Sequence, residues 1–135
     1  MPEEYKYAEV SEKIIKAAYQ VYNTLGFGFL EKVYENALAI EVREAGLSVE
    51  QQQPVKVSYR GAIVGDYVAD LIVDGKVLVE LKSVSTLDKA HEVQLVNYLK
   101  ATGMEVGLLL NFGKKIEIKR RVFTKSFSPD QRSSA

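Results

Sequence analysis

Three charged side chains interrupt two strongly apolar stretches in the middle of the chain. Asp70 lies within the run 67–73, and Glu80 and Lys82 lie within the run 76–84. A buried carboxylate lowers stability unless a cation or hydrogen bonds compensate it, so these charges need a chemical reason. Mg²⁺ prefers carboxylate oxygens together with waters and substrate phosphate. The pattern therefore predicts a metal site formed by Asp70 and Glu80.

The two apolar runs flank Asp74-Gly75, which is a strong signal for a β-hairpin. The register of this hairpin decides whether Asp70 and Glu80 share a face of the sheet, because a shift by one residue flips every side chain. A two-residue turn puts the two carboxylates on opposite faces. A three-residue loop over 73–75, with its glycine left-handed, puts them on the same face. The metal hypothesis therefore predicts this bulged hairpin, or a distortion beside Asp70.

Further polar side chains follow at regular spacing. Glu80 and Lys82 are two residues apart on a predicted strand and point the same way. An ammonium group there could orient or deprotonate an attacking water and offset negative charge in a transition state. The next predicted helix carries His91, Gln94 and Tyr98 on one stripe, where Gln94 and Tyr98 could fix the lysine, a water or a phosphate. We interpret His91 as structural or exposed, with proton transfer as the alternative.

The composition restricts the class of protein. A chain of 135 residues predicts one domain over 1–125, followed by a polar tail over 126–135. The 18 basic residues balance 18 acidic residues, so a nucleic-acid partner would need a local basic patch. Without cysteine, disulfides, thiolate chemistry and zinc–thiolate sites are excluded. The start lacks a signal-peptide core and no apolar run could span a bilayer, which predicts a cytoplasmic protein without a membrane partner.

The hydrophobic periodicity predicts an α/β fold with the element order ααβββαββ and a mixed sheet. Helices are expected over 8–25, 30–45 and 87–101, the last of them capped by Ser85 or Thr86. Strands are expected over 47–59, 63–73, 76–83, 104–111 and 115–123. Pro54 indicates an edge strand or a bulge. The residues expected to face inward on the second helix are Val33, Ala37, Leu38 and Val42.

These motifs together resemble a known family, the PD-(D/E)XK nuclease superfamily in its RecB-like form with a Gln-x-x-x-Tyr helix. The residues that carry the resemblance are Asp70, Glu80-Leu81-Lys82 and Gln94-Leu95-Val96-Asn97-Tyr98. The stretch Gly28-Phe29-Leu30-Glu31-Lys32-Val33-Tyr34 is similar to the motif of the GxxExxY proteins. The likeness extends over residues 14–121, with the motifs in the expected order on the expected elements. The usual proline before the first aspartate is Ala69 here, which is a small departure.

The resemblance implies an αβββαβ core with an extra N-terminal helix and an extra C-terminal strand. It implies Mg²⁺, for which Mn²⁺ can substitute, with Asp70, Glu80, the Leu81 carbonyl and Glu31 as ligands. It also implies three further catalytic residues, with Lys82 as the active-site lysine and Gln94 and Tyr98 in support. The implied activity is hydrolysis of phosphodiester bonds by a metal-activated water, in DNA rather than RNA by the habit of the family.

Two other functions fit the same residues. The first is a non-catalytic subunit that binds nucleic acid or joins a larger assembly while retaining the nuclease fold. The complete set of acidic residues argues against it, because an unused buried carboxylate cluster lowers stability. The second is a homodimeric enzyme that acts on another phosphorylated substrate. A homodimer or a larger assembly is also compatible with a nuclease.

Several other polar residues have structural interpretations. Of two neighbouring helix carboxylates, Glu31 is expected in the site and Glu35 in solvent. Tyr34 is interpreted as a packing residue with a polar tip, and Asp74 and Asn111 as turn residues. A basic run is either a phosphate-contacting edge or a solvated edge strand protected by lysines. It comprises Lys114, Lys115, Lys119, Arg120, Arg121 and Lys125.

Overall fold

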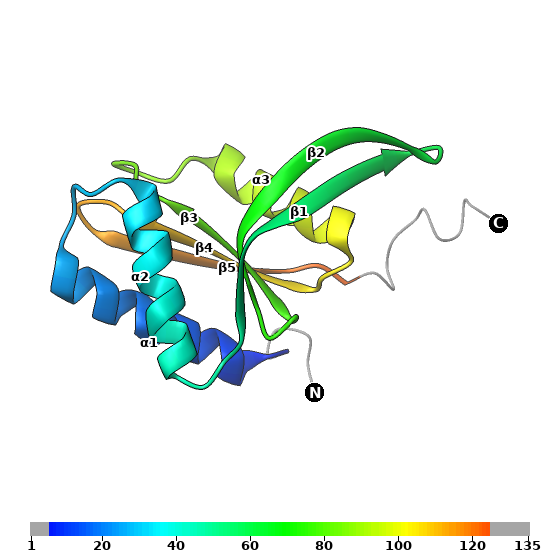
Figure 1. Ribbon diagram of the computed structural model, residues 1–135. Coiled ribbons are helices and arrows are strands. Elements are labelled where there is room, and N and C mark those ends of the chain that lie inside the picture. The colour runs from blue at the N-terminus through cyan, green and yellow to red at the C-terminus, as the bar shows by residue number, and fades with distance from the viewer. Residues whose placement is uncertain (1–5, 125–135) are drawn as a thin grey trace.

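A five-stranded mixed sheet runs through the molecule, with helices packed on both of its faces (Figure 1). The computed structural model describes residues 6–124, so the predicted tail 126–135 and Lys125 of the basic run lie outside it. The helices are α1 (Ala8–Leu25), α2 (Glu31–Glu44) and α3 (Lys89–Thr102). The strands are β1 (Val49–Tyr59), β2 (Ala62–Val73), β3 (Val77–Lys82), β4 (Val106–Phe112) and β5 (Ile116–Val122). This order confirms the predicted ααβββαββ arrangement.

The strands lie in the order β1-β2-β3-β4-β5. Neighbouring strands are antiparallel except β3 and β4, which are parallel and are connected through α3. Every residue of β4 is buried, as its continuous apolar run predicts. β1 is an edge strand, which confirms the expectation from Pro54. Helices α2 and α3 with the first four strands form the αβββαβ core, and α1 and β5 are the additions.

Two apolar clusters hold the layers together. One lies between the sheet and helices α1 and α2, and includes Ile14, Leu38 and Leu71. The other lies between the sheet and α3. A Cβ at Gly107 of β4 would come within 2.8 Å of Leu95 Cδ1, so this glycine lets α3 pack directly on the strand. No helix within residues 6–124 is both long and apolar enough to cross a membrane.

The structure corrects three local expectations. The hairpin loop comprises residues 74–76, because Val73 pairs with Val77, and is therefore shifted by one residue from the predicted loop. Helix α3 begins two residues later than expected, and its N-cap is Asp88 rather than Ser85 or Thr86. Val33 is 38% exposed, so the prediction that it faces inward was wrong.

Candidate active site

At Gln52 of β1 and Asp70 of β2, the two strands reverse which of their side chains face each side of the sheet. Ala69 packs in the cluster beside α3, whereas Leu71 packs in the cluster beside α1 and α2. Residues two apart on a regular strand share a face, so β2 reverses its faces at Asp70. Opposite Asp70, Gln52 has a φ of 54°, which is uncommon for a residue other than glycine. Figure 1 shows the resulting bend, and it confirms the expected distortion beside Asp70.

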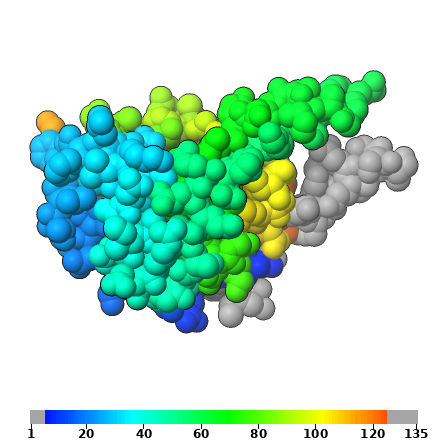
Figure 2. Space-filling model, in the orientation of Figure 1, coloured from blue at the N-terminus to red at the C-terminus, as the bar shows by residue number. Residues whose placement is uncertain are grey.

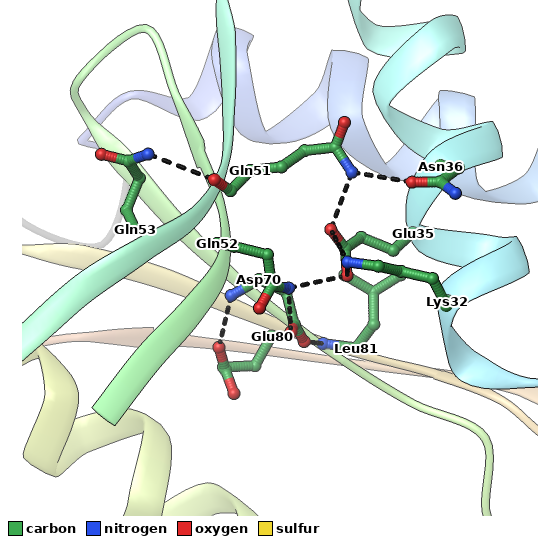
Figure 3. A network of polar contacts seen from close by, with 9 residues as sticks. All are labelled: Lys32, Glu35, Asn36, Gln51, Gln52, Gln53, Asp70, Glu80 and Leu81. Atoms are coloured by element: carbon green, nitrogen blue, oxygen red, sulfur yellow. Dashed lines mark hydrogen bonds and ion pairs between the residues drawn. The ribbon is translucent and has the colours of Figure 1, made fainter. Parts of the chain in front are cut away.

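Asp70 and Glu80 are brought together where β2 separates from β3. The backbone pairing of these strands covers only 71–73 with 77–79. Beyond it, the Asp70 N–H donates to Glu80 Oε1 at 2.9 Å, and the Leu81 N–H donates to Asp70 Oδ2 at 2.8 Å (Figure 3). Each carboxylate therefore accepts a bond from the other strand's backbone. This exchange places the two acids side by side, as the metal hypothesis requires.

The electrostatics of this pair are unusual for acids. Burial, followed by the neighbouring Asp70 charge, raises the pKa of Glu80 to about 8. Burial also raises the pKa of Asp70, against the opposing hydrogen bond from Leu81. The positive charge of Lys82 lowers the pKa of both acids, although the net shifts remain upward. The pair is therefore a site that favours the binding of positive charge, such as a proton.

Glu31 is the first residue of α2 and reaches the same electrostatic environment. Burial raises its pKa, the Asp70 charge raises it further, and the Lys82 charge lowers it. The loop before α2 is held by Tyr34, whose hydroxyl donates to the Gly26 carbonyl at 2.6 Å and accepts from the Phe29 N–H at 3.2 Å. The position of Glu31 is thus set by a loop that these two hydrogen bonds hold in place.

Tyr34 itself has the packing role expected of it. Its ring is fully buried and stacks on Phe112, with ring centroids 4.6 Å apart. The polar tip makes the loop contacts described above. The interpretation as a packing residue with a polar tip is confirmed, and it explains why an aromatic hydroxyl follows Glu31 by three residues.

Helix α3 contributes two residues from the other side of the sheet. Gln94 Nε2 donates to the Tyr98 hydroxyl at 3.2 Å. Burial and the Glu80 charge both raise the pKa of Tyr98, which places its phenol within the field of the carboxylate. Of the stripe predicted on this helix, Tyr98 therefore lies near the acids, and Gln94 is joined to it by the hydrogen bond.

Glu35 is buried, not solvated as expected, and forms the centre of a polar network (Figure 3). Its side chain is 4% exposed. It accepts from Gln51 Nε2 at 2.7 Å, from Gln52 Nε2 at 2.8 Å and from Lys32 Nζ at 3.2 Å. Gln52 Nε2 also lies 3.3 Å from Asp70 Oδ1, so it links the two carboxylates. Sequence reasoning missed both Glu35 and Gln52 as parts of the site.

Two signals in the sequence could have pointed to this network. Glu35 follows Glu31 by four residues and therefore lies on the same side of the helix. It also precedes Leu38 by three residues on a stripe that packs inward. The run Gln51-Gln52-Gln53 places consecutive amides on a strand whose alternation is otherwise clear. A buried acid needs donors of this kind.

The side chains of His91 and Asn111 form hydrogen bonds with backbone groups. The Asp88 N–H donates to His91 Nδ1 at 3.0 Å, so the histidine closes a capping box at the start of α3. The structural interpretation of His91 is confirmed. The turn interpretation of Asn111 was wrong, because its buried amide donates to the Val84 carbonyl and accepts from the Val84 N–H, both at 2.9 Å. Asn111 thereby fixes the segment that follows Lys82.

The basic run divides into two kinds of residue. Arg121 forms an ion pair with Glu92 of α3, and the hydrogen bond from Arg121 lowers the pKa of Glu92. Arg120 contacts Ser11 of α1. These arginines connect β5 to the helices on both faces of the sheet. Lys114 and Lys115 are exposed directly before β5.

The donor atoms at the site fit a hard divalent cation. Within residues 6–124, no three or more His, Cys, Asp or Glu side chains gather into a ready metal cluster. Mg²⁺ is commonly held by one or two carboxylates, with waters and substrate phosphate completing its shell. Asp70 and Glu80, linked through the backbone hydrogen bonds that they exchange, supply two carboxylates for such a shell.

Comparison with known proteins places this geometry in context. A model of the PD-(D/E)XK nuclease superfamily matches residues 8–122. The crystal structure of SSO0001 is similar with a TM-score of 0.55 and 18% identity, over 88% of this chain and 59% of that one. An alkaline exonuclease (LHK-Exo) from Laribacter hongkongensis is similar with a TM-score of 0.50 and 14% identity, over 76% of this chain and 60% of that one.

At these identities the two likenesses concern the fold alone. The chain spans about three fifths of each of those two proteins. No protein among the curated sequences is detectably similar to it.

Proposed function

This chain belongs to the PD-(D/E)XK nuclease superfamily, and on that premise we propose that it is a metal-dependent nuclease that hydrolyses phosphodiester bonds, with DNA as its substrate. The observation that supports this most strongly is the exchange of hydrogen bonds between Asp70 and the strand of Glu80. A fold that needed only stability would continue the backbone pairing at this point. Here two acids replace it, with Lys82 following directly.

Asp70 and Glu80 are the proposed ligands of Mg²⁺, with the Leu81 carbonyl and Glu31 completing the set. Bound there, Mg²⁺ would polarise the scissile phosphate and lower the pKa of an attacking water. Mn²⁺ shares the preference for oxygen ligands and is proposed to substitute. The carboxylates orient the reacting groups, and the buried setting strengthens their interaction with positive charge.

Lys82, Gln94 and Tyr98 are the proposed supporting residues. Lys82 lies in the field of all three acids, since its charge lowers the pKa of Glu31, Asp70 and Glu80. Its ammonium group is proposed to orient the water and offset charge on the phosphate. Gln94 and Tyr98 are joined by a hydrogen bond and can hold the lysine or a phosphate oxygen from the side of α3.

Cleavage of plasmid and single-stranded DNA in the presence of Mn²⁺ tests this proposal. We expect wild type to cut and Glu80→Ala to lose at least about 100-fold in rate, since it removes a charge that acts at the reacting phosphate. Glu12→Ala, which removes an exposed acid of α1, is the matched control and should cut like wild type. Cleavage by Glu80→Ala at the wild-type rate, in protein free of contaminating nuclease, would reject the assignment. Inactivity of all three proteins would favour the non-catalytic subunit.

A further inference from the structure

A groove lies between α3 and the far halves of β1 and β2. Beyond the bend at Asp70, these strands project from the sheet as an arm (Figures 1 and 2). The groove between this arm and α3 has a volume of about 690 Å³. Gln94 and Tyr98 line it, so the groove is continuous with the candidate active site. Its size is that of a ligand site rather than a surface crease.

An exposed aromatic ring forms the arm's side of this groove. Tyr67 is 48% exposed, and its ring centroid lies 5.7 Å from that of Tyr98. A Cβ at Gly65 would come within 2.9 Å of Tyr67 Cε2, so the glycine leaves space in which the ring lies against the arm. The ring is therefore held in place while much of it faces solvent. Such a ring can stack on a planar partner.

The charges of the groove have a single sign. Two lysines, Lys56 and Lys100, line it, and no acidic residue does. Lys56 Nζ lies 3.0 Å from Asp66 Oδ2, but both side chains are exposed and such pairs are weak. Lys56 can therefore exchange this partner for a phosphate. Asn97 adds an amide for hydrogen bonding.

We propose that this groove binds an unpaired strand of nucleic acid and leads it to the active site. Tyr67 stacks on a base, and Lys56 and Lys100 contact the backbone phosphates. An aromatic ring beside positive charge is the combination that recognises single strands, whereas a duplex keeps its base faces stacked inside and offers mainly phosphates. The proposal rests on the proposed function, because it names the form of substrate that reaches Glu80.

Binding measured without cleavage tests the groove separately from the chemistry. The probe is a fluorescein-labelled oligothymidylate, with a labelled hairpin duplex for comparison, read by anisotropy in EDTA. We expect the single strand to bind more tightly than the duplex. Tyr67→Ala should weaken single-strand binding roughly 5- to 100-fold, and Tyr67→Phe should retain it because the stacking ring remains. Lys100→Gln should reduce the slope of log affinity against log salt by about 1.

Tyr59→Ala is the matched control, because Tyr59 is an exposed tyrosine of the arm that does not line the groove. Equal affinity of Tyr67→Ala and Tyr59→Ala would overturn the proposal, as would tighter binding of the duplex or no binding of either probe. Cleavage of single-stranded DNA that is unaffected by Tyr67→Ala would reject the groove and keep the nuclease. Tyr67-dependent binding without cleavage under any metal would keep the groove and reject the nuclease.

Discussion

Glu80 carries a carboxyl group in surroundings that oppose its charge. The residue is 6% exposed, and its pKa is raised to about 8. The folded protein therefore holds a proton that the unfolded chain releases near its ordinary value of 4.5. Because the folded state binds more protons in this interval, the stabilisation from the neutral acid is complete below pH 4.5 and is lost as pH rises to about 8.

Replacing this acid with its neutral isostere should remove that pH dependence. We expect metal-free Glu80→Gln to gain stability over wild type as pH rises from 5 to 9, by about 1–3 kcal/mol at the upper end. Urea unfolding at the two pH values measures the difference. Glu12→Gln, at an exposed position of α1, should show none. If the free energy of unfolding differs between Glu80→Gln and wild type by the same amount at both pH values, Glu80 is not held neutral in the folded protein.

Gln52 is the residue through which the buried Glu35 acts on the site. It donates to both Glu35 and Asp70 from a left-handed backbone. We expect Gln52→Ala to weaken Mn²⁺ binding by about 10–100-fold, since groups that orient a metal ligand typically contribute this much. Gln52→Gly relieves the backbone conformation while removing the side chain, so it should show the same loss.

Gln53→Ala provides the comparison for this prediction, because the Gln53 amide donates within its own strand, to the Gln51 carbonyl. Calorimetric titration of all four proteins measures the affinities. Metal affinity that is unchanged in both Gln52 variants would mean that the contact with Asp70 has no positioning role.

Residue types alone predicted part of this site. Asp70 and Glu80 are recognisable because a charge within an apolar strand contradicts its surroundings. Glu35 is not recognisable in this way, because helix acids are ordinarily exposed and its burial depends on glutamines 16 and 17 residues away. Gln52 shows no local sign of its left-handed backbone. Both residues acquire their roles only when α2 and β1 meet.

At the scale of elements, the loop between α1 and α2 decides where Glu31 lies. Tyr34 holds this loop by two hydrogen bonds while its ring stacks on Phe112. We expect Tyr34→Phe to keep the stacking but to lower the free energy of unfolding by about 1–3 kcal/mol, because two hydrogen bonds, to the Gly26 carbonyl and from the Phe29 N–H, are lost. Cleavage should fall as well, since Glu31 is no longer presented by a fixed loop.

Urea unfolding and the plasmid assay check the two parts of this prediction. Tyr19→Phe, which removes a hydroxyl from an exposed tyrosine of α1, should change neither. Full stability and full activity of Tyr34→Phe would contradict the role given to this loop.

The periodicity of the chain predicted the elements well and their ends less well. The hairpin loop is displaced by one residue because Asp74 Oδ1 accepts from the Ser48 N–H at 2.8 Å, a contact between segments far apart in sequence. The start of α3 is set by the pair Asp88 and His91, whereas Ser85 and Thr86 were equally plausible caps by residue type. Local sequence patterns do not indicate which of these contacts forms, and so they do not fix the ends of the elements.

At the scale of the whole molecule, the parallel pair β3 and β4 brings the parts of the site together. Because the connection between them passes through α3, this helix packs on the sheet beside them, with Leu95 against Gly107 of β4. The order of elements and the family resemblance predicted this arrangement. A distortion beside Asp70 was expected, but the arm that β1 and β2 form beyond it was not, because no turn residue marks the point where Gln52 and Asp70 leave the regular ladder.

The most direct test of the central claim is a calorimetric titration of Mn²⁺ into the folded protein at pH 7, in two buffers with different ionisation enthalpies. We expect wild type to bind the ion and to release protons as it does so, because Glu80 holds a proton until a cation displaces it. We expect Asp70→Asn to lose the binding. Absence of Mn²⁺ binding by wild type, or equal binding by Asp70→Asn, would contradict a metal site at this pair of acids.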